Sequence, residues 1–146
     1  MTFDRWRRCL LAVGLVLCVF GGAMALLSST PLFALPPIDS VFWGTGGPAG
    51  GTRDFQAWIY AAWGATLAGW GLTIAGIAAH PLARREAWAW SLLAAGTALW
   101  FVLDTAVSAA HGVWFNVAVN VVVLAAAGVP LLAMRPALGH GGAGAD

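Results

Sequence analysis

A single acidic residue, Asp104, lies inside a long apolar segment and has polar side chains at helical spacing on either side of it. The residues seven before, four after and seven after Asp104 fall on the same face of a helix as its carboxylate. Two asparagines follow, four residues apart, and share one face of the next segment. A carboxylate with amide and hydroxyl neighbours can hold a proton or a polar ligand. The candidate site residues are Asp104, Thr97, Ser108, His111, Asn116 and Asn120.

The sequence lacks the short motifs of common catalytic and metal sites. No HExxH, CxxC, GxSxG, P-loop or dinucleotide-binding pattern occurs, and no second carboxylate accompanies Asp104 in its apolar segment. A net charge of +1 without any lysine also argues against a nucleic-acid surface. We therefore expect a protein that is not an enzyme, that binds no metal or cofactor, and that has no nucleic-acid partner.

The composition is typical of a membrane protein rather than of a soluble domain. Of the 146 residues, 60% are hydrophobic and 9% are charged, too few charges to cover a soluble core of this size. Four predominantly apolar runs each have the roughly 20 residues that cross about 30 Å of hydrocarbon as a helix. The sequence predicts an all-α membrane protein, a four-helix transmembrane bundle forming one domain over residues 1–138, with a disordered tail at 139–146. The predicted helices are 9–29, 55–79, 87–110 and 113–134.

The third and fourth runs must fold back on each other, because one helix over both would be about 72 Å long, more than twice the membrane core. Gly112 is the best candidate for a left-handed residue that ends the third helix. A hairpin around this turn brings Asp104 to the depth of Asn120, and Ser108 to that of Asn116, in the outer half of the membrane. Two interpretations stay open: these groups lock the hairpin by hydrogen bonds, or they form a ligand or proton site.

The segment between the first two runs, residues 30–54, is expected to be an external loop rich in proline and glycine. It holds four prolines and five glycines, which forbid a long helix. Its first half is apolar, with Leu32, Phe33 and Ile38 among its side chains. This half either anchors in the headgroup region or caps the outer mouth of the bundle, where it would act as a gating lid.

Arginine positions predict the orientation in the membrane. The four-helix model puts six arginines on one side and only Arg53 on the other, so the first side, with both termini, is expected in the cytoplasm of a bacterium. Arg7 and Arg8 before the first apolar run also match a signal peptide. That run continues to full spanning length, which favours a retained helix in a multi-pass protein of the inner membrane. The six arginines are Arg5, Arg7, Arg8, Arg84, Arg85 and Arg135.

Small residues on the second helix predict a packing surface. Ala61, Ala65, Gly69 and Thr73 recur at every fourth position, and small side chains let helix backbones approach closely in lipid. Gly64, Ala68 and Gly76 flank this stripe. We interpret these small residues as a contact within the chain, with a homodimer contact as the alternative. Three tryptophans lie deep in the predicted helices and are expected inside the bundle rather than at the membrane surface: Trp63, Trp70 and Trp100.

Several segments carry a resemblance to known proteins: Gln56–Tyr60, Gly64–Gly71, Trp100–Thr105, and Trp114–Asn116 with Asn120. In these segments the chain resembles a group of small four-helix bacterial integral membrane proteins of uncharacterised function. The resemblance implies the fold and no activity. From the residues, we expect a non-catalytic bundle that binds a lipid-like ligand or a partner membrane protein through its outer polar pocket. Membrane lipid, another membrane protein and a homo-oligomer are the expected partners. The alternative is a small proton-linked transporter that uses Asp104.

Overall fold

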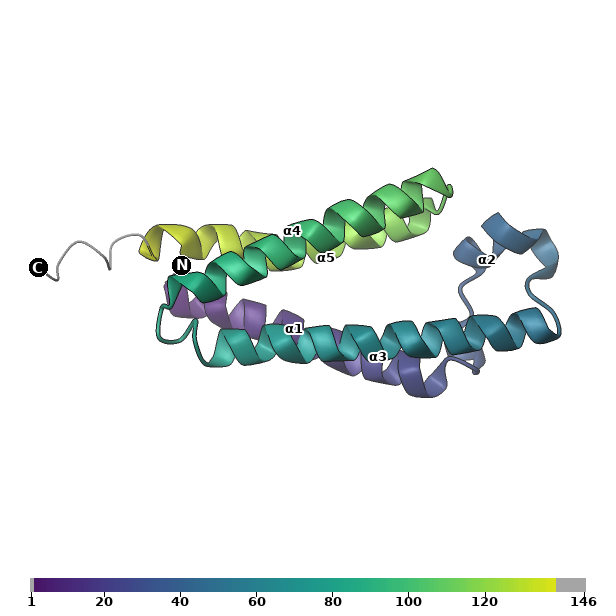
Figure 1. Cartoon of the computed structure of the whole chain (residues 1–146), viewed down its shortest axis with the longest axis horizontal. Coiled ribbons are helices and arrows are strands. Elements are labelled where there is room, and N and C mark those ends of the chain that lie inside the picture. Colours follow the sequence, from purple (N-terminus) through teal and green to yellow (C-terminus); the bar gives the residue numbers. More distant parts are fainter. Residues whose placement is uncertain (1, 139–146) are drawn as a thin grey trace, which may run out of the picture.

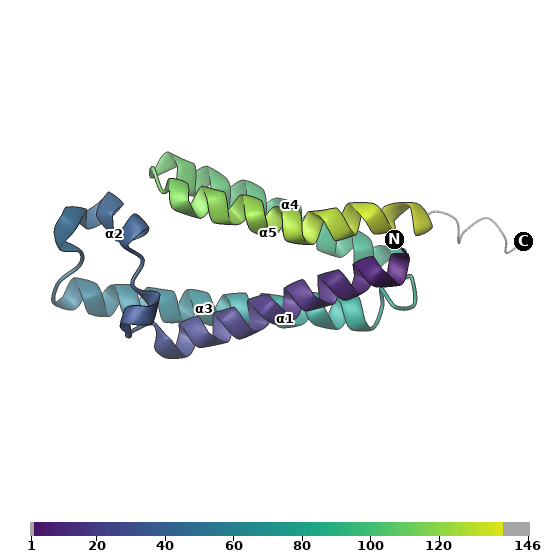
Figure 2. The same ribbon diagram turned by 180° about the vertical axis from the view of Figure 1, so that it is seen from behind.

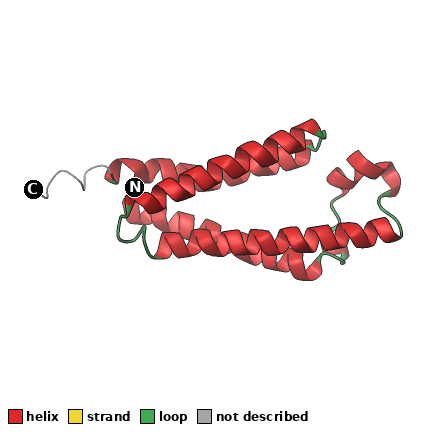
Figure 3. Ribbon diagram, viewed as in Figure 1, coloured by secondary structure: helices red, strands yellow, loops and turns green. Residues whose placement is uncertain are grey.

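The computed structural model describes residues 2–138, and the regular elements in this range are all helices (Figure 1, Figure 3). Four of them are long and apolar enough to cross a membrane, as expected for a multi-pass membrane protein. The tail predicted at 139–146 lies outside the described residues. The four long helices are α1 (Phe3–Leu27), α3 (Gly51–Ala79), α4 (Ala87–Ala110) and α5 (Trp114–Met134).

The sequence predicted these four helices, with errors only at their ends. The structure has α4 over the predicted residues, whereas α1 begins at Phe3 rather than at Cys9, and α3 begins at Gly51 rather than at Phe55. The added turns carry charged residues such as Arg7 and Arg53. An uncharged run marks only the part of a helix that suits hydrocarbon, and the helix itself can continue past that part with charged residues.

The long helices form two antiparallel pairs, α1 with α3 and α4 with α5. The two pairs converge near the start of α1 and the end of α5 and diverge toward the other end of the molecule (Figure 1, Figure 2). The main apolar core lies where the pairs meet. Its buried residues come from all four long helices and the α3–α4 turn: Phe3, Leu10, Ile74, Ala78, Leu82, Ala89, Leu93, Ala127, Leu131 and Met134.

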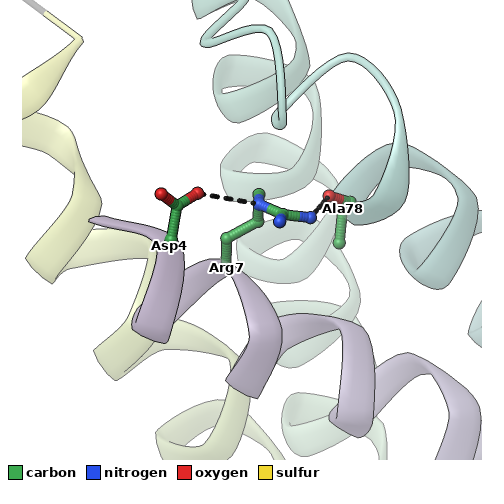
Figure 4. A network of polar contacts seen from close by, with 3 residues as sticks. All are labelled: Asp4, Arg7 and Ala78. Carbon is green, nitrogen blue, oxygen red and sulfur yellow. Dashed lines mark hydrogen bonds and ion pairs between the residues drawn. The ribbon is translucent and has the colours of Figure 1, made fainter. Parts of the chain in front are cut away.

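Polar contacts reinforce this closed end. The Arg7 guanidinium donates a hydrogen bond to the carbonyl oxygen of Ala78 over 3.1 Å and lies 3.4 Å from the Asp4 carboxylate (Figure 4). It therefore ties the first turns of α1 to the last turn of α3. The Trp90 indole N–H donates to the carbonyl oxygen of Leu131 over 2.7 Å and connects α4 with α5.

The α3–α4 turn carries a carboxylate with two hydrogen-bond donors. Glu86 accepts from the Arg84 guanidinium over 2.5 Å and from the Trp88 indole N–H over 2.6 Å. Both bonds favour the ionised form, so the donors at Arg84 and then Trp88 hold the pKa of Glu86 below its usual value. The turn thus keeps Arg84 and Glu86 paired beside the closed end of the bundle.

Glycines carry the contact between α1 and α3. Gly14 and Gly21 on α1 face Gly64 and Gly71 on α3, and the members of each pair are seven residues apart. A Cβ atom on Gly71 would lie 2.3 Å from the backbone nitrogen of Cys18 and 2.6 Å from the carbonyl oxygen of Gly14. The two backbones therefore touch directly, and only glycine fits at these positions.

The packing stripe predicted on the same helix lies on another face. Ala65, Gly69 and Thr73 are exposed, Ala61 is half-buried, and a Cβ atom on Gly69 would meet nothing within 4 Å. The prediction that this stripe forms the contact within the chain is therefore wrong. With 3.6 residues per turn, steps of four drift around the helix, whereas the seven-residue step from Gly64 to Gly71 stays close to one line.

The α4–α5 turn has the predicted hinge. Gly112 has a φ angle of 72°, which places it in the left-handed region, and the helix ends there. The Val113 N–H donates to the Ser108 carbonyl oxygen over 2.8 Å, and the Gly112 N–H donates to the Ala109 carbonyl oxygen over 3.0 Å. This pair of bonds is the Schellman arrangement, which satisfies the last carbonyl groups of α4. It also sets the register between α4 and α5.

The segment between α1 and α3 lies at the end where the helix pairs diverge (Figure 1). It contains the short helix α2 (Pro36–Trp43), whose first positions are prolines, as is common at a helix start. Phe33 packs in a small buried cluster with Met24 and Tyr60. The Gln56 side chain donates to Asp39 over 2.5 Å and to the Tyr60 hydroxyl over 3.1 Å, which fastens α2 to α3.

Candidate functional site

A cavity of about 440 Å³ lies between the two helix pairs. Its volume is within the about 300–1,000 Å³ that is typical of small-molecule sites. All four long helices and the segment with α2 contribute to its wall. The lining residues are Leu17, Phe20, Met24, Leu32, Phe33, Leu35, Ile38, Trp63, Leu67, Trp70, Trp100, Asp104, Phe115, Asn116, Val119, Asn120 and Val123. The cavity is therefore apolar and aromatic, with a carboxylate and two amides on its α4–α5 side.

The Asp104 carboxylate holds these polar groups together. Its Oδ1 atom accepts hydrogen bonds from Asn116 Nδ2 over 2.6 Å, from Asn120 Nδ2 over 3.0 Å and from the Ser108 hydroxyl over 3.1 Å. Asn116 Nδ2 also donates to Ser108 Oγ over 2.8 Å, and Asn120 Nδ2 donates to Thr105 Oγ1 over 3.2 Å. The predicted hydrogen bond across the hairpin, between Asp104 and Asn120 or Asn116, is confirmed, and the structure shows a bond to each of the two asparagines.

Helical spacing and the α4–α5 turn explain why the side chains bonded around Asp104 lie close together. Asp104 and Ser108 are one helical turn apart on α4, and Asn116 and Asn120 are one turn apart on α5. The turn at Gly112 then places the two stretches at the same level. Ser108 and Asn120 are buried, and Asp104 and Asn116 are half-buried beside the cavity.

Other predicted residues lie apart from this cluster. Thr97 is buried on α4 but is two turns from Asp104, which is roughly 10 Å along the helix axis. The His111 ring nitrogen Nδ1 lies 2.9 Å from the Val107 carbonyl oxygen, and the His111 side chain is exposed at the turn. Arg53 also lies apart from the cluster, because its guanidinium donates twice to the Pro48 carbonyl oxygen.

Sequence reasoning missed Thr105 and most of the cavity wall. Thr105 follows Asp104 directly, so helical spacing put it on a different face, yet its hydroxyl oxygen reaches Asn120. The three deep tryptophans do line the cavity, and the Trp70 and Trp100 rings have centroids 5.1 Å apart. Their expected place inside the bundle is confirmed for Trp70 and Trp100, which are half-buried, whereas Trp63 is 39% exposed.

The segment with α2 closes part of the cavity. Leu32, Phe33, Leu35 and Ile38, which lie between the end of α1 and the start of α3, contribute to its wall. This is the capping position considered for the apolar half of the segment. The Phe20 and Phe33 rings are in contact, with centroids 5.9 Å apart.

A groove of about 610 Å³ on the outside of α1 shares part of this wall. Phe20, Leu32 and Phe33 line both the groove and the cavity. The other residues of the groove are apolar side chains of α1: Leu15, Val16, Val19 and Ala23. Phe20, Leu32 and Phe33 therefore form the partition between the groove and the cavity, and the two rings in it are in contact.

Comparisons with protein-family models, with curated proteins and with solved structures found no match to this chain. The function is therefore argued from the geometry of the cavity and of the Asp104 cluster.

Proposed function

We propose that this protein is a non-catalytic membrane protein that binds a lipid-like ligand in the cavity between its helix pairs. The carrying observation is the composition of the cavity wall, in which an apolar and aromatic surface carries the Asp104, Asn116 and Asn120 side chains on its α4–α5 side. An amphiphile has the same division between an apolar chain and a polar head. The apolar chain gains from leaving water, and the polar head gains hydrogen bonds to fixed partners.

Binding of a neutral single-chain amphiphile tests this proposal. The detergent-solubilised protein is incubated with 1-decanoylglycerol, and the bound fraction is measured by native mass spectrometry. Leu67→Trp places a larger side chain in the cavity wall and is expected to weaken binding roughly tenfold, which corresponds to 1.4 kcal/mol.

Leu72→Trp is the matched control, because Leu72 is on the same helix, is 62% exposed and does not line the cavity. The control should bind like the wild type. Equal loss in both variants, or no binding by the wild type, would contradict a site between the helix pairs.

We further propose that the protein resides in the cytoplasmic membrane of a bacterium with both termini in the cytoplasm. The basis is the arginine count, together with the grouping of those arginines at the closed end. There Arg85 lies over the Phe3 ring at 5.1 Å, and Arg135 lies over the Trp90 ring at 5.7 Å.

Cysteine labelling tests the orientation. In a background with Cys9→Ala and Cys18→Ala, single cysteines are introduced as Thr45→Cys beside α2 and as Ala83→Cys in the α3–α4 turn. Both positions are exposed, so a membrane-impermeant maleimide reports the side of the membrane and not burial. In intact cells the reagent should label only Thr45→Cys. Labelling of Ala83→Cys alone would reverse the orientation.

Proton-linked transport is the second candidate function. It is favoured by the position of Asp104 at the cavity between two helix pairs, because a carboxylate there can exchange a proton as a ligand comes and goes. Uptake of decylammonium into proteoliposomes under an imposed proton gradient, compared between the wild type and Asp104→Asn, distinguishes transport from binding alone. Binding without gradient-driven uptake supports the first proposal.

A further inference from the structure

The hydrogen bonds of the Asp104 cluster leave three acceptor oxygen atoms of cavity-lining residues without a donor. A carboxylate can only accept hydrogen bonds, so Asn116 and Asn120 must turn their Nδ2 atoms toward it. Each Nδ2 atom then makes a second bond inside the cluster, to Ser108 or to Thr105. Within residues 2–138 no donor is bonded to Asp104 Oδ2 or to the Oδ1 atoms of the two asparagines. Three oxygen atoms on cavity-lining residues thus remain available to a ligand with N–H groups.

The cavity also lacks a basic partner for the carboxylate. None of the described residues that line it is arginine or histidine. The two candidates near this end of the molecule are engaged elsewhere, since Arg53 donates to the Pro48 carbonyl oxygen and His111 contacts the Val107 carbonyl oxygen. A carboxylate in apolar surroundings is stabilised by a positive charge at hydrogen-bonding distance. A cationic ligand would supply that charge.

Aromatic rings in the cavity wall also favour a cationic ligand. Trp100 lies one helical turn before Asp104, and Phe115 lies beside Asn116 on α5; both line the cavity. Trp70 contacts Trp100 from the opposite helix pair. The faces of such rings attract cations, and the attraction grows when the cation leaves water.

We infer that the ligand of this cavity is an amphiphile with a protonated amine head, which donates N–H groups to Asp104 and to the asparagine oxygens while its alkyl chain lies along the aromatic wall. This inference rests on the proposed function and specifies its ligand class. The positive charge meets the carboxylate, and the N–H groups meet the three open acceptors. A primary ammonium therefore fits better than a quaternary ammonium, which has the charge but no N–H group.

A series of probes with the same ten-carbon chain tests the inference: decylammonium, decyltrimethylammonium, decanol and decyl sulfate. Binding to the detergent-solubilised protein at neutral pH is measured by native mass spectrometry, for the wild type and for Asp104→Asn. Because partition of each probe into detergent is common to both proteins, the ratio of their affinities isolates the contribution of the carboxylate. We expect Asp104→Asn to weaken decylammonium binding at least about tenfold and to leave decanol binding within about twofold.

The wild type alone also decides the question, in case Asp104→Asn folds poorly. Decylammonium should bind the wild type more tightly than decyltrimethylammonium, and decyl sulfate should bind least. Decylammonium and decanol binding equally well would overturn the ammonium preference while leaving the lipid-like site intact. Absence of binding by all four probes would overturn the site itself, and with it the inference.

Discussion

Replacing Gly71 with alanine is expected to lower the melting temperature of the detergent-solubilised protein by several degrees. The new Cβ atom would lie 2.3 Å from the Cys18 nitrogen and 2.6 Å from the Gly14 carbonyl oxygen, both of which are backbone atoms of α1. Backbone atoms inside a helix cannot turn aside as a side chain can, so the two helices must separate. Overpacking of this kind costs about 1–3 kcal/mol and occasionally more.

Gly69→Ala is the matched control for this prediction. Gly69 lies on the same helix, and a Cβ atom there would meet nothing within 4 Å. Alanine suits a helix better than glycine by about 1 kcal/mol, so the control should melt at the wild-type temperature or slightly above it. Thermal unfolding followed by circular dichroism measures both variants. Equal melting temperatures for Gly71→Ala and Gly69→Ala would show that the glycine contact does not hold α1 against α3.

The variant Asp104→Leu is also expected to be clearly less stable than the wild type. This change removes the acceptor that two asparagines and a serine share, and it leaves their N–H and O–H groups with fewer partners beside an apolar cavity. Hydrogen bonds between membrane helices contribute about 0.6 kcal/mol each on average, and unpaired partners add to that loss. We expect a total destabilisation of about 1–2 kcal/mol.

Asp104→Asn separates the geometric role of this side chain from its charge. An asparagine oxygen accepts the same three hydrogen bonds, so the variant should melt close to the wild type. The two variants are compared by thermal unfolding under identical detergent conditions. Equal stability of Asp104→Leu and the wild type would mean that the cluster does not join α4 to α5. Equal destabilisation by leucine and asparagine would show that the charge, and not the hydrogen bonds, supports the hairpin.

The lengths of the apolar runs and the spacing of the polar residues were sufficient to predict the four long helices and the polar cluster. The four helices follow from apolar length, the turn follows from Gly112, and the meeting of Asp104 with Asn116 and Asn120 follows from counting turns on both sides of that glycine. Each of these arguments is local in sequence or bridges a single tight turn. They succeed because a hairpin fixes the relative register of its two helices.

The arrangement of the helix pairs could not be derived in this way. The cavity exists because the α1–α3 pair and the α4–α5 pair diverge. The spacing of residues within one helix carries no information on the angle between two helix pairs. The α1–α3 contact did leave a signal, since glycines seven residues apart occur in both segments, at Gly14 and Gly21 and at Gly64 and Gly71. Matching small residues between segments, rather than within one segment, would have found it.

The partition at Phe20 and Phe33 bears on how fast a ligand exchanges. A molecule that passed between these rings would move from the groove on α1 into the cavity without entering water. That step would require the side chains shared by the groove and the cavity to move aside, and it would not require the alkyl chain to be hydrated. Substitutions in this partition would then change the rate of ligand exchange, whereas substitutions at Asp104 would change the affinity.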